Sequence, residues 1–535
     1  MPKKLTYQKI TAYEAVKGET KKIVLLYSGS LFTNVLIPWL KNAYKAEVIT
    51  VTVDLGQKED FENLKKQAYK YGAQKALIID AKEEFAKNYI TRVIKANASY
   101  QGSYHLLTPL SRPLLAKIAV MVAQDEGASA IAHACSGQSN DQMRIDGTIL
   151  ALNPDMKVIA PVREGELTRK SARVLAKEYQ IPTEYSNQYY SYDENLWGVS
   201  ILGGDIENSV LPSRIENLLK LTTTPENAQE VAERVTIDFN QGIPTGINGE
   251  TMNLVELIQK LNTLGGRHGV GLSYAIEDMI LGLKSKSIDE EPAADILISA
   301  HHELEKYLCS RMENEFKPII DHKWTYLCYD GFWYEPLMQD LNVYIDEVNQ
   351  KVTGAVTVRL YRGTAEVIGI KTPKTIFEKK LATYLDTGVL NQRGAAAYIE
   401  LRSLSMQLSN RSEKTILLSI GKRTNKFKLL PYLRRLDQTK YRLYATYKTH
   451  KFLKSLNIPS IMVNKISQPS LKPNLSDLLE QRRFDLIISI PTSASATLKE
   501  KSDTKFILEK AGDADVPLIT DLKEAQEILQ KLQQS

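Results

Sequence analysis

The chain has little cysteine, no long apolar run and no strong excess of one charge among its 535 residues. Cys135, Cys309 and Cys328 are too few and too scattered for a disulfide framework or a zinc knuckle, so we expect reduced thiols. No segment approaches the roughly 18 consecutive apolar residues of a membrane span. Residues 1–22 lack the apolar stretch of a signal peptide, which predicts a cytoplasmic protein.

The charge balance argues for small partners. Lysine and arginine number 69 against 63 aspartates and glutamates, a net charge of +6 that is small for so many charged residues. Anionic small molecules fit this balance, whereas a nucleic-acid-binding protein would need a basic stripe with interleaved aromatics, which the sequence lacks. We therefore expect small-molecule partners, no nucleic acid and no membrane.

The composition, 43% hydrophobic and 25% charged, is that of a folded globular chain with several domains. In the first half, apolar runs alternate with helical stretches, which predicts an α/β domain with a doubly wound parallel sheet. Ligands bind at the carboxyl ends of the strands in such sheets. The predicted strands are residues 23–27, 47–53, 76–79, 130–134 and 158–161.

Beyond residue 187 the pattern changes to longer loops, with strands at 355–361 and 365–369 and a helix at 252–264, which predicts an α+β domain. A second run of β–α repeats after residue 415 predicts a small flavodoxin-like domain. The predicted boundaries are an N-terminal extension (1–20), a nucleotide-binding domain (21–186), an α+β domain (187–406), a polar linker (407–414) and the C-terminal domain (415–535).

Two strand-end loops carry candidate chemistry. The stretch SGSLFTN at residues 28–34 places small and hydroxyl residues where backbone amides and a helix N-terminus would face an anion. The stretch HACSGQSNDQMR at 133–144 holds Asn140, Asp141 and Arg144, whose donors and acceptors suit an amino acid. A ligand-free turn and a solvated loop remain the alternatives, and His268 in a glycine-rich loop is more often structural than a base.

Eight collinear segments resemble the argininosuccinate synthase family over about residues 22–404. The segments are YSGSLFTN (27–34, against the family's YSGGLDTS), LGQKED (55–60), LSRP (110–113), SGQSNDQMR (136–144, against TGKGNDQVR), NPDMKVIAP (153–161), SYDENL (191–196), GGRHGVG (265–271) and GFW (331–333).

This resemblance implies an ATP-dependent carbon–nitrogen ligase of arginine biosynthesis and the urea cycle. The ureido oxygen of citrulline is adenylylated with loss of pyrophosphate, and the amine of aspartate then displaces AMP. The resemblance also implies a PP-loop domain of the adenine nucleotide alpha hydrolase-like fold, a synthetase domain that binds substrates and multimerises, and a homo-oligomer, tetramer or dimer. ATP with Mg²⁺ is the implied cofactor, and no protein side chain is expected to bind the metal.

The implied ATP site departs from the family's pattern at three positions. Ser30, Phe32 and Asn34 stand for a glycine, an aspartate and a serine, and Phe32 is expected to put an apolar ring beside the polyphosphate and its Mg²⁺. Asp54 is a candidate replacement for the lost carboxylate. The implied ATP-binding residues are Tyr27, Ser28, Gly29, Ser30, Thr33, Asn34, Val53 and Gly137.

The aspartate side matches the family better than the citrulline side. Ser136, Asn140 and Asp141 match the aspartate-binding residues, and Asp141 and Arg144 are the implied catalytic residues. Pro109, Leu202 and Asp289 replace a serine, a glutamate and a tyrosine of the citrulline side, and Ala134 and Gln138 replace a glycine and a lysine near the nucleotide. Each lost hydrogen bond costs about 1–3 kcal/mol, so citrulline would bind weakly unless the substrate differs. The implied citrulline-binding residues are Tyr104, Asn140, Arg144, Ser191, Ser200 and Glu277.

The C-terminal part resembles the methylglyoxal-synthase-like (MGS-like) domain that ends carbamoyl phosphate synthetase. Lys426, Thr446, Thr449 and Lys465 match the residues that hold the phosphate of a nucleotide effector there. A degenerate domain that only packs is the alternative. Two hypotheses for the whole chain stay open: a ligase of the synthase type, acting on citrulline or a related ureido or amide substrate, and a catalytically inactive relative that binds a metabolite or regulates, which Phe32 favours.

Overall fold

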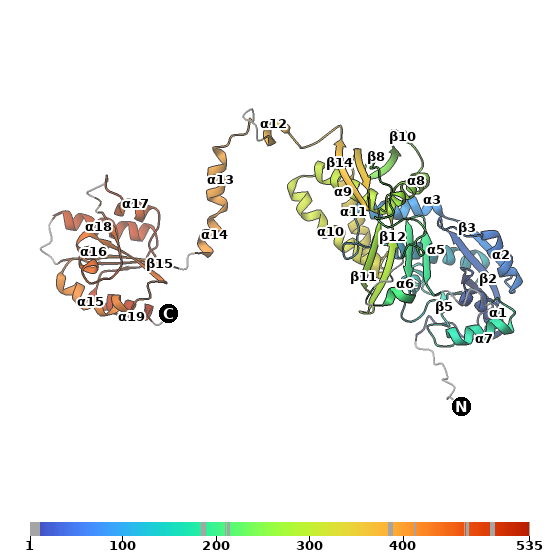
Figure 1. Ribbon diagram of the computed structural model, residues 1–535. Coiled ribbons are helices and arrows are strands. Elements are labelled where there is room, and N and C mark those ends of the chain that lie inside the picture. The colour runs from blue at the N-terminus through green and yellow to red at the C-terminus, as the bar shows by residue number, and fades with distance from the viewer. Residues whose placement is uncertain are drawn as a thin grey trace. The chain divides into compact units, whose positions relative to one another are not determined.

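The computed structural model describes residues 11–182, 189–208, 210, 215–383, 389–410, 413–464, 466, 470–492 and 498–533. Its contacts divide the chain into two compact units, Met1–Tyr384 and Leu385–Ser535 (Figure 1). Within the described residues, no helix is long and apolar enough to cross a membrane.

The first sheet consists of five parallel strands in the order β3-β2-β1-β4-β5. Strand β1 is central, and the chain winds outward from it in both directions, so the carboxyl end of β1 lies where ligands bind in doubly wound sheets. This confirms the predicted architecture. The strands are β1 (Lys22–Leu26), β2 (Glu47–Asp54), β3 (Lys75–Asp80), β4 (Ala130–Ala132) and β5 (Lys157–Ile159).

Helices cover both faces of this sheet. Ile23 and Leu25 point to one face and pack under α1 (Leu31–Tyr44), α2 (Phe61–Lys70) and α7 (Arg169–Glu178). Val24 points to the other face, toward α5 (Leu107–Glu126), as the two-residue period of a strand requires. The remaining helices are α3 (Lys82–Phe85), the π-helix η1 (Ala86–Ile90), α4 (Thr91–Lys95) and α6 (Asp141–Leu152).

The second part of this unit is α+β, as expected, with two antiparallel sheets. One has the order β11-β12-β7-β6 and the other β10-β9-β8-β13-β14. A single apolar cluster runs from Val24 of the first sheet to Val356 and Val358 of the last, so the two parts share a core. The strands are β6 (Ser191–Asn195), β7 (Gly198–Leu202), β8 (Glu233–Asn240), β9 (Ile243–Ile247), β10 (Glu250–Thr251), β11 (Leu272–Asp278), β12 (Lys284–Glu290), β13 (Gly354–Tyr361) and β14 (Thr364–Lys371). The helices are η3 (Gly204–Glu207, 3-10), α8 (Leu254–Arg267), α9 (Pro292–Leu308), α10 (Arg311–Asp330) and α11 (Pro336–Asn349).

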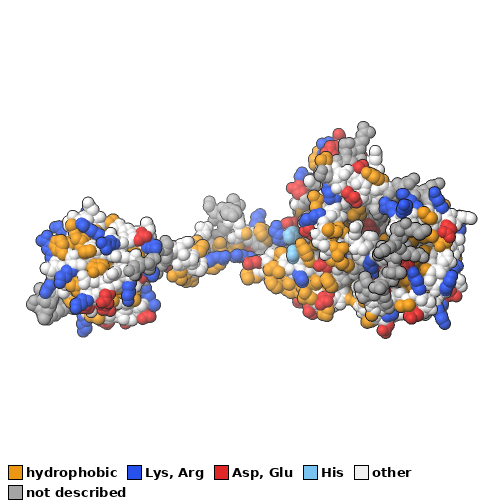
Figure 2. Space-filling model, turned by 90° about the horizontal axis from the view of Figure 1, so that it is seen from below, with side chains coloured by type: hydrophobic (Ala, Val, Ile, Leu, Met, Phe, Trp, Pro, Cys, Tyr) orange, Lys and Arg blue, Asp and Glu red, His pale blue; other side chains and the backbone are white. Residues whose placement is uncertain are grey.

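Between the synthase-like part and the last sheet lie α12 (Lys379–Ala382), α13 (Gly394–Arg402) and α14 (Leu404–Ser409). The predicted linker at 407–414 begins inside α14. Figure 2 shows hydrophobic side chains along this stretch, and nothing among the described residues buries them. The exposed apolar residues are Tyr398, Ile399, Leu401, Leu404, Met406 and Leu408.

The C-terminal sheet is again parallel, in the order β17-β16-β15-β18-β19, with an apolar cluster on each face. The expected three-layer architecture is present. Its first strand β15 is central, whereas the flavodoxin order is 2-1-3-4-5. The strands are β15 (Lys414–Ile420), β16 (Tyr441–Thr446), β17 (Ile461–Val463), β18 (Leu486–Ile490) and β19 (Leu518–Ile519). The helices are α15 (Arg423–Arg435), α16 (Tyr447–Lys454), α17 (Leu475–Glu480), α18 (Leu498–Asp513) and α19 (Leu522–Leu532).

Candidate active site

The loop between β1 and α1 is shaped by a glycine. Gly29 has φ +72°, and a Cβ there would lie 2.2 Å from Leu64 Cδ2 on α2. Only glycine avoids both the backbone strain and this overlap. Ser30 then starts α1 as its N-cap, with its side chain accepting from the Thr33 amide. The sequence therefore forms a tight turn that leads directly into a helix N-terminus.

Three hydroxyls gather in this turn. Ser30 Oγ lies 3.2 Å from Ser28 Oγ and 3.1 Å from Thr33 Oγ1. Ser28 and Ser30 are exposed, and their hydroxyls bond chiefly to one another, so they can turn toward a ligand. The N-terminus of the 14-residue helix α1 adds a favourable field for an anion. This end of the sheet fits a phosphate group.

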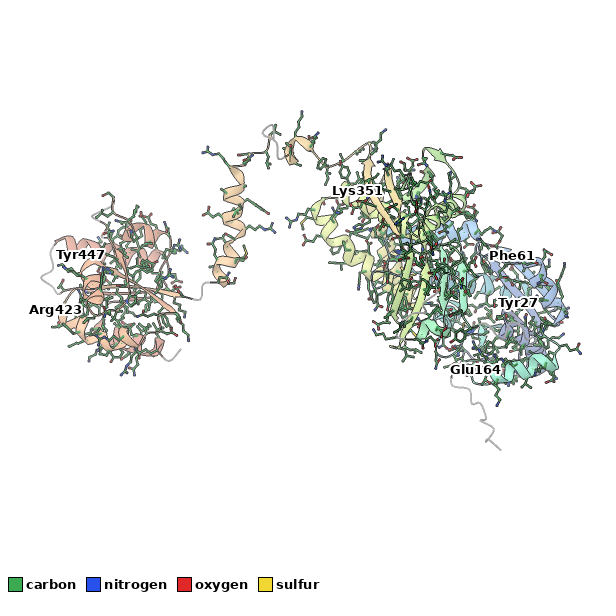
Figure 3. The ribbon with its side chains drawn as sticks, viewed as in Figure 1. Tyr27, Phe61, Glu164, Lys351, Arg423 and Tyr447 are labelled. Atoms are coloured by element: carbon green, nitrogen blue, oxygen red, sulfur yellow. The ribbon has the colours of Figure 1, made fainter. Side chains whose placement is uncertain are left out.

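Tyr27 and Asn34 hold the turn in place through buried hydrogen bonds. Asn34 is fully buried, its Oδ1 accepts from the Tyr27 hydroxyl, and its Nδ2 donates to the Gly29 carbonyl at 2.9 Å. The Tyr27 amide in turn donates to Val51 O at 2.9 Å (Tyr27 is labelled in Figure 3). Both residues were predicted to bind ATP, and their side chains are instead engaged by the loop itself.

The departures at Phe32 and Asp54 have simple structural outcomes. Phe32 is half-buried and packs against the apolar cluster on the α1 face of the sheet. Asp54 forms an ion pair with Lys82, and its Oδ1 accepts from the Gly56 amide at 2.9 Å. The Phe32 ring is therefore part of a hydrophobic contact, and the Asp54 carboxylate is engaged by its own chain. Val53 is buried in the sheet.

Asp141, at the start of α6, lies between two arginines. Its Oδ2 is 2.8 Å from Arg112 Nη2, and its Oδ1 is 3.0 Å from Arg144 Nη1. Burial raises the pKa of Asp141, but Arg112 and Arg144 outweigh it and hold the pKa below its ordinary value, so the carboxylate is charged. Arg144, 3% exposed, donates from Nε to Tyr329 O at 2.8 Å and lies 4.8 Å from the centre of the Tyr329 ring.

Arg112 received no role in the sequence analysis, although it lies within the quoted LSRP segment. It binds Asp141 and also Asp193 on β6, so one guanidinium joins the loop of the first sheet to the antiparallel part. Thr108 Oγ1 donates to the same Asp193 carboxylate at 2.9 Å. The presence of a charged residue in an otherwise apolar helix start was the available signal.

Asn140 is buried and held at both ends by the second part of the unit. Its Nδ2 donates to the Tyr329 hydroxyl at 3.0 Å, and its Oδ1 accepts from the Ile280 amide at 3.0 Å. Ser136 is half-buried in the same loop, and Gly137 is exposed, with its carbonyl accepting from Gln142 Nε2 at 2.6 Å. The loop at 136–141 is therefore fixed in place by both parts.

Buried carboxylates mark the predicted citrulline side. Asp289 is 0% exposed and accepts from Ser200 Oγ at 2.6 Å and Ser287 Oγ at 2.7 Å, and burial raises the pKa of Asp289 to about 6. Burial also raises the pKa of Glu277, whose Oε2 has no hydrogen-bond partner. Because the Ser200 hydroxyl donates its proton to Asp289, Ser200 Oγ can act toward a ligand only as a hydrogen-bond acceptor.

The structure brings most of the predicted citrulline-side residues together. The charges of Glu277, Asp289 and Arg144 all act on Tyr104, which is buried and accepts from the Thr108 amide at 2.9 Å. Ser191 is exposed and lies opposite Leu202 across the β6–β7 pair. Pro109 lies in the first turn of α5, where a missing N–H leaves no helical bond unmade.

The candidate effector residues of the C-terminal sheet are bonded to their own backbone. Thr449 is buried, and its Oγ1 contacts both the amide (3.1 Å) and the carbonyl (3.3 Å) of Ile420. Thr446 Oγ1 lies 3.5 Å from Thr449 Oγ1. Lys426 Nζ donates to Lys448 O at 2.9 Å, and burial lowers the pKa of Lys426. Lys465 lies outside the described residues. Arg423 and Tyr447, at the helix starts nearby, are exposed (Figure 3).

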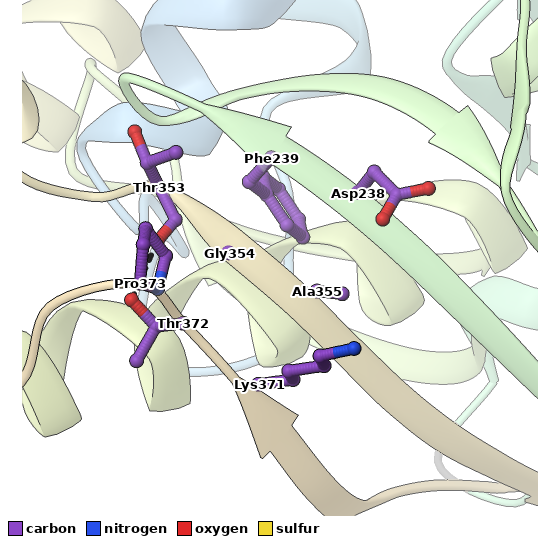
Figure 4. A pocket seen from close by; sticks show the side chains of 8 residues that line it. All are labelled: Asp238, Phe239, Thr353, Gly354, Ala355, Lys371, Thr372 and Pro373. Atoms are coloured by element: carbon purple, nitrogen blue, oxygen red, sulfur yellow. Dashed lines mark hydrogen bonds between the residues drawn. The ribbon is translucent and has the colours of Figure 1, made fainter.

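Two cavities lie away from these residues. One of about 470 Å³ is lined by Asp238, Phe239 and Lys371 among others, on β8, β13 and β14 (Figure 4). A second of about 410 Å³ lies between α4 and α11. None of the predicted site residues lines either one. In the described part of the chain, no group of three or more histidines, cysteines, aspartates or glutamates is placed to hold a metal ion.

Comparison with known proteins matches three family models along the chain. The arginosuccinate synthase N-terminal HUP domain matches residues 22–182, its C-terminal domain matches residues 190–409, and an MGS-like domain matches residues 428–520. The chain is 46% identical over 389 residues to the argininosuccinate synthase of Pyrococcus furiosus, covering 72% of this chain and 94% of the relative. The synthase of Carboxydothermus hydrogenoformans is 42% identical (74% and 98% covered), and that of Chlorobium limicola 40% (72% and 97%).

Proposed function

The chain belongs to the argininosuccinate synthase family, and from this premise we propose that it joins citrulline, or a closely related ureido or amide substrate, to aspartate with ATP as the energy source. AMP and pyrophosphate are the other products. The observation that supports this most directly is the turn after β1, where an obligatory glycine, three hydroxyls and a helix N-terminus are combined in the shape that a polyphosphate needs.

For the nucleotide, we assign the phosphate contacts to Ser28, Ser30 and Thr33 and the shape of the turn to Gly29, Tyr27 and Asn34. A Cβ at position 29 would meet Leu64 on α2 and disturb the turn that presents these hydroxyls, so the glycine present fits a phosphate-binding turn. Mg²⁺ would arrive with the phosphates and be held by their oxygens and water, because oxygen is its preferred ligand and the described residues form no carboxylate cluster.

For the amino acids, we assign the catalytic roles to Asp141 and Arg144. The ionised Asp141 carboxylate would orient the amine of aspartate, with Ser136 and Asn140 beside it, and Arg144 would balance the negative charge on the phosphate oxygens of the leaving AMP. The ureido oxygen bonds to the α-phosphorus as pyrophosphate leaves. The aspartate nitrogen then bonds to the ureido carbon, loses its proton, and AMP leaves with the C–O bond electrons.

The inactive-relative hypothesis depended on Phe32, which brings an apolar ring and removes a carboxylate; the packing of the ring against the apolar cluster argues against obstruction of ATP. The citrulline side differs chemically from the family's pattern, since Asp289 replaces a neutral phenol with a buried carboxyl. Tyr104, Ser191, Ser200 and Glu277 are the residues assigned to that substrate.

The test is a reaction of the purified protein with ATP, Mg²⁺, citrulline and aspartate, following AMP, pyrophosphate and the mass of argininosuccinate. Leaving out each substrate in turn is the control. Product formation with wild-type protein supports the proposal, and a Phe32→Asp variant of similar activity shows that the ring does not obstruct ATP. If the wild type neither binds nor cleaves ATP while Phe32→Asp gains binding, the protein is a non-catalytic relative.

We further propose that the C-terminal unit binds a nucleotide effector through Lys426, Thr446, Thr449 and Lys465, and that the protein is a homo-oligomer. The MGS-like match supports the first point. The exposed apolar side chains of α13 and α14 support the second, because such a surface is stable in water when a partner covers it. Equilibrium dialysis with nucleotides and sedimentation analysis test the two points separately.

A further inference from the structure

A cavity of about 410 Å³ lies on the synthase-like unit, away from every residue assigned above. Its walls come from the π-helix η1 and α4 on one side and from α11 on the other, with the turn between β8 and β9 at the rim. The lining residues that carry its chemistry are Lys87, Asn88, Arg92, Lys95, Asp346 and Gln350. The established family matches assign no role to them.

The charges in this cavity do not balance. Asp346 is the only carboxylate among the lining residues, and it is shared by two cations: Arg92 Nη1 lies 2.6 Å from its Oδ2 and Lys95 Nζ lies 2.9 Å from its Oδ1. The third cation is Lys87, and its side-chain amine has no hydrogen-bond or ion-pair partner among the described residues. The cavity therefore carries an excess of positive charge together with unused donors.

Lys95 is fixed before any ligand arrives. Its side chain is only 13% exposed, and its carbonyl accepts from Lys317 Nζ at 2.9 Å. Lys317 is itself buried and paired with Glu305 and Asp321, so the backbone that carries Lys95 is anchored in a buried polar network. A cation whose position is set by the fold binds an anion without an ordering cost.

The wall that carries Lys87 and Asn88 is irregular. Both residues lie in the five-residue π-helix Ala86–Ile90, inserted between two short α-helical segments. A π-turn is rare and is frequently found at functional sites. Here it presents to the cavity two side chains, Lys87 and Asn88, that have no partner among the described residues, and an uninterrupted α-helix would point them in other directions.

We propose that this cavity, which we call the α4–α11 site, binds a phosphate group through Lys87, Arg92 and Lys95. The oxygens of a phosphate would compete with the Asp346 carboxylate for Arg92 and Lys95. They would also accept hydrogen bonds from the Lys87 amine, and charge-assisted hydrogen bonds to phosphate are short and strong. The phosphate could be free or part of a nucleotide, and the cavity is large enough for either.

The test is residue-resolved, because the turn after β1 and the C-terminal unit would also bind phosphates. Lysine acylation of the full-length protein, mapped by peptide mass spectrometry, is measured with inorganic phosphate, tripolyphosphate or AMP as probes. We expect at least one probe to slow acylation of Lys87 and Lys95 by about tenfold or more. Acylation of Lys260, an exposed lysine of α8 that is paired with Glu250, should not change. Protection by AMP but not by inorganic phosphate assigns the group to a nucleotide, and protection by inorganic phosphate or tripolyphosphate to the free anion.

A Lys87→Gln variant tests the same site independently. Lys87 is exposed, so the variant should melt like the wild type. We expect Lys95 to lose its protection by the probe in Lys87→Gln, with ligation in the absence of added phosphate unchanged, whereas Lys260→Gln keeps the protection. Equal acylation of Lys87 with and without all three probes, or full protection of Lys95 in Lys87→Gln, overturns the proposal. Loss of ligation in wild-type protein would concern the proposed function and not this site.

Discussion

The two parallel sheets of this chain have the same strand order and different chemistry at the carboxyl end of their central strands. After β1, the hydroxyls of Ser28 and Ser30 are exposed and contact mainly each other. After β15, the Thr449 hydroxyl is buried and bonded to the Ile420 backbone, and the Lys426 amine is bonded to a carbonyl. The topology places a binding crevice in both sheets. The hydroxyls after β1 are free to turn toward an anion, whereas the polar groups of the C-terminal sheet must first give up their bonds to the backbone.

The glycines that follow the two strands make the same contrast. Gly29 has a positive φ and a Cβ there would meet the side chain of Leu64, so it shapes a turn that projects its amides. A Cβ at Gly421 would lie 2.7 Å from the Thr492 amide nitrogen, so this glycine lets two strand ends approach each other. One glycine serves a site and the other serves packing.

The largest effect should come from Gly29→Ala. The overlap with Leu64 and the positive φ must displace the turn, and a displacement of about 1 Å costs roughly a hundredfold in rate. We expect ATP affinity and ligation to fall together by about that factor. Gly102→Ala is the matched control, because φ there is +87° but no atom lies within 4 Å of the added Cβ. Equal activity of the two variants would contradict the role given to Gly29.

The second effect tests whether the Asn34 side chain holds the turn. Asn34→Ala removes a buried group that bonds the Tyr27 hydroxyl and the Gly29 carbonyl. A buried group left unsatisfied costs about 1–3 kcal/mol, so we expect a loss of about 1–3 kcal/mol in the unfolding free energy of the synthase-like unit, measured in urea. Asn34→Ser, the residue typical of the family, is the comparison. If Asn34→Ala lowers ATP affinity without lowering stability, Asn34 contacts the ligand instead.

The third prediction concerns hydroxyls of the candidate active site that are bonded to another side chain of the protein, as Thr449 is bonded to the backbone in the C-terminal sheet. Asp289 accepts from Ser200 and Ser287, and burial raises the pKa of Asp289 to about 6, above its ordinary value near 3.8. The folded state therefore holds this proton more tightly than the unfolded state, and the associated stability is full below about pH 4 and lost as the pH rises through about 6.

Asp289→Asn has no such proton, so its stability relative to the wild type should improve by about 2–3 kcal/mol between pH 4 and pH 7. Urea unfolding of both proteins at the two pH values measures this. Asp278→Asn is the control with the opposite sign, since hydrogen bonds from Lys284 and Gln101 lower the pKa of Asp278. A wild-type-to-variant difference that is the same at both pH values would show that Asp289 titrates normally.

The smallest effect should come from Thr449→Val in the C-terminal sheet. It removes the hydroxyl that bonds the Ile420 backbone while keeping the volume, so we expect a loss of about 1–2 kcal/mol confined to the C-terminal unit and no change in ligation. Calorimetry of the full chain resolves the two units if they melt separately. Because Thr449 is also a proposed effector contact, nucleotide binding should weaken as well. If Thr449→Val keeps its stability and loses only nucleotide binding, the hydroxyl does not hold the backbone and the contrast between the two sheets fails.

The strands and helices were predictable because local patterns set them. The alternating apolar runs of the first half coincide with β1 to β5, and hydrophobic periodicity needs no distant contact. The order of the C-terminal strands was less accessible. Parallel pairing is non-local, and the same β–α repeat is compatible with a central or an off-centre first strand.

The candidate site was predictable in its members but not in their contacts. The motifs pointed to Asp141 and Arg144, whereas the ion pairs of Arg112 join it to Asp141, 29 residues away in sequence, and to Asp193, 81 residues away. Phe32 shows the same limit. Its identity suggested an obstructed ATP site, and only the direction of the ring, toward the apolar cluster, changes that interpretation. The domain boundaries and the individual ligand contacts stay predictions.

The helical stretch between the synthase-like part and the last sheet has a mechanical consequence. A helix gains about 1.5 Å and turns by about 100° with each residue, so one residue inserted in α13 (Gly394–Arg402) turns its later apolar side chains away from its earlier ones. A partner surface that needs both groups on one face would therefore depend on the phase of an insertion. Binding to such a surface would return about every 3.6 inserted residues.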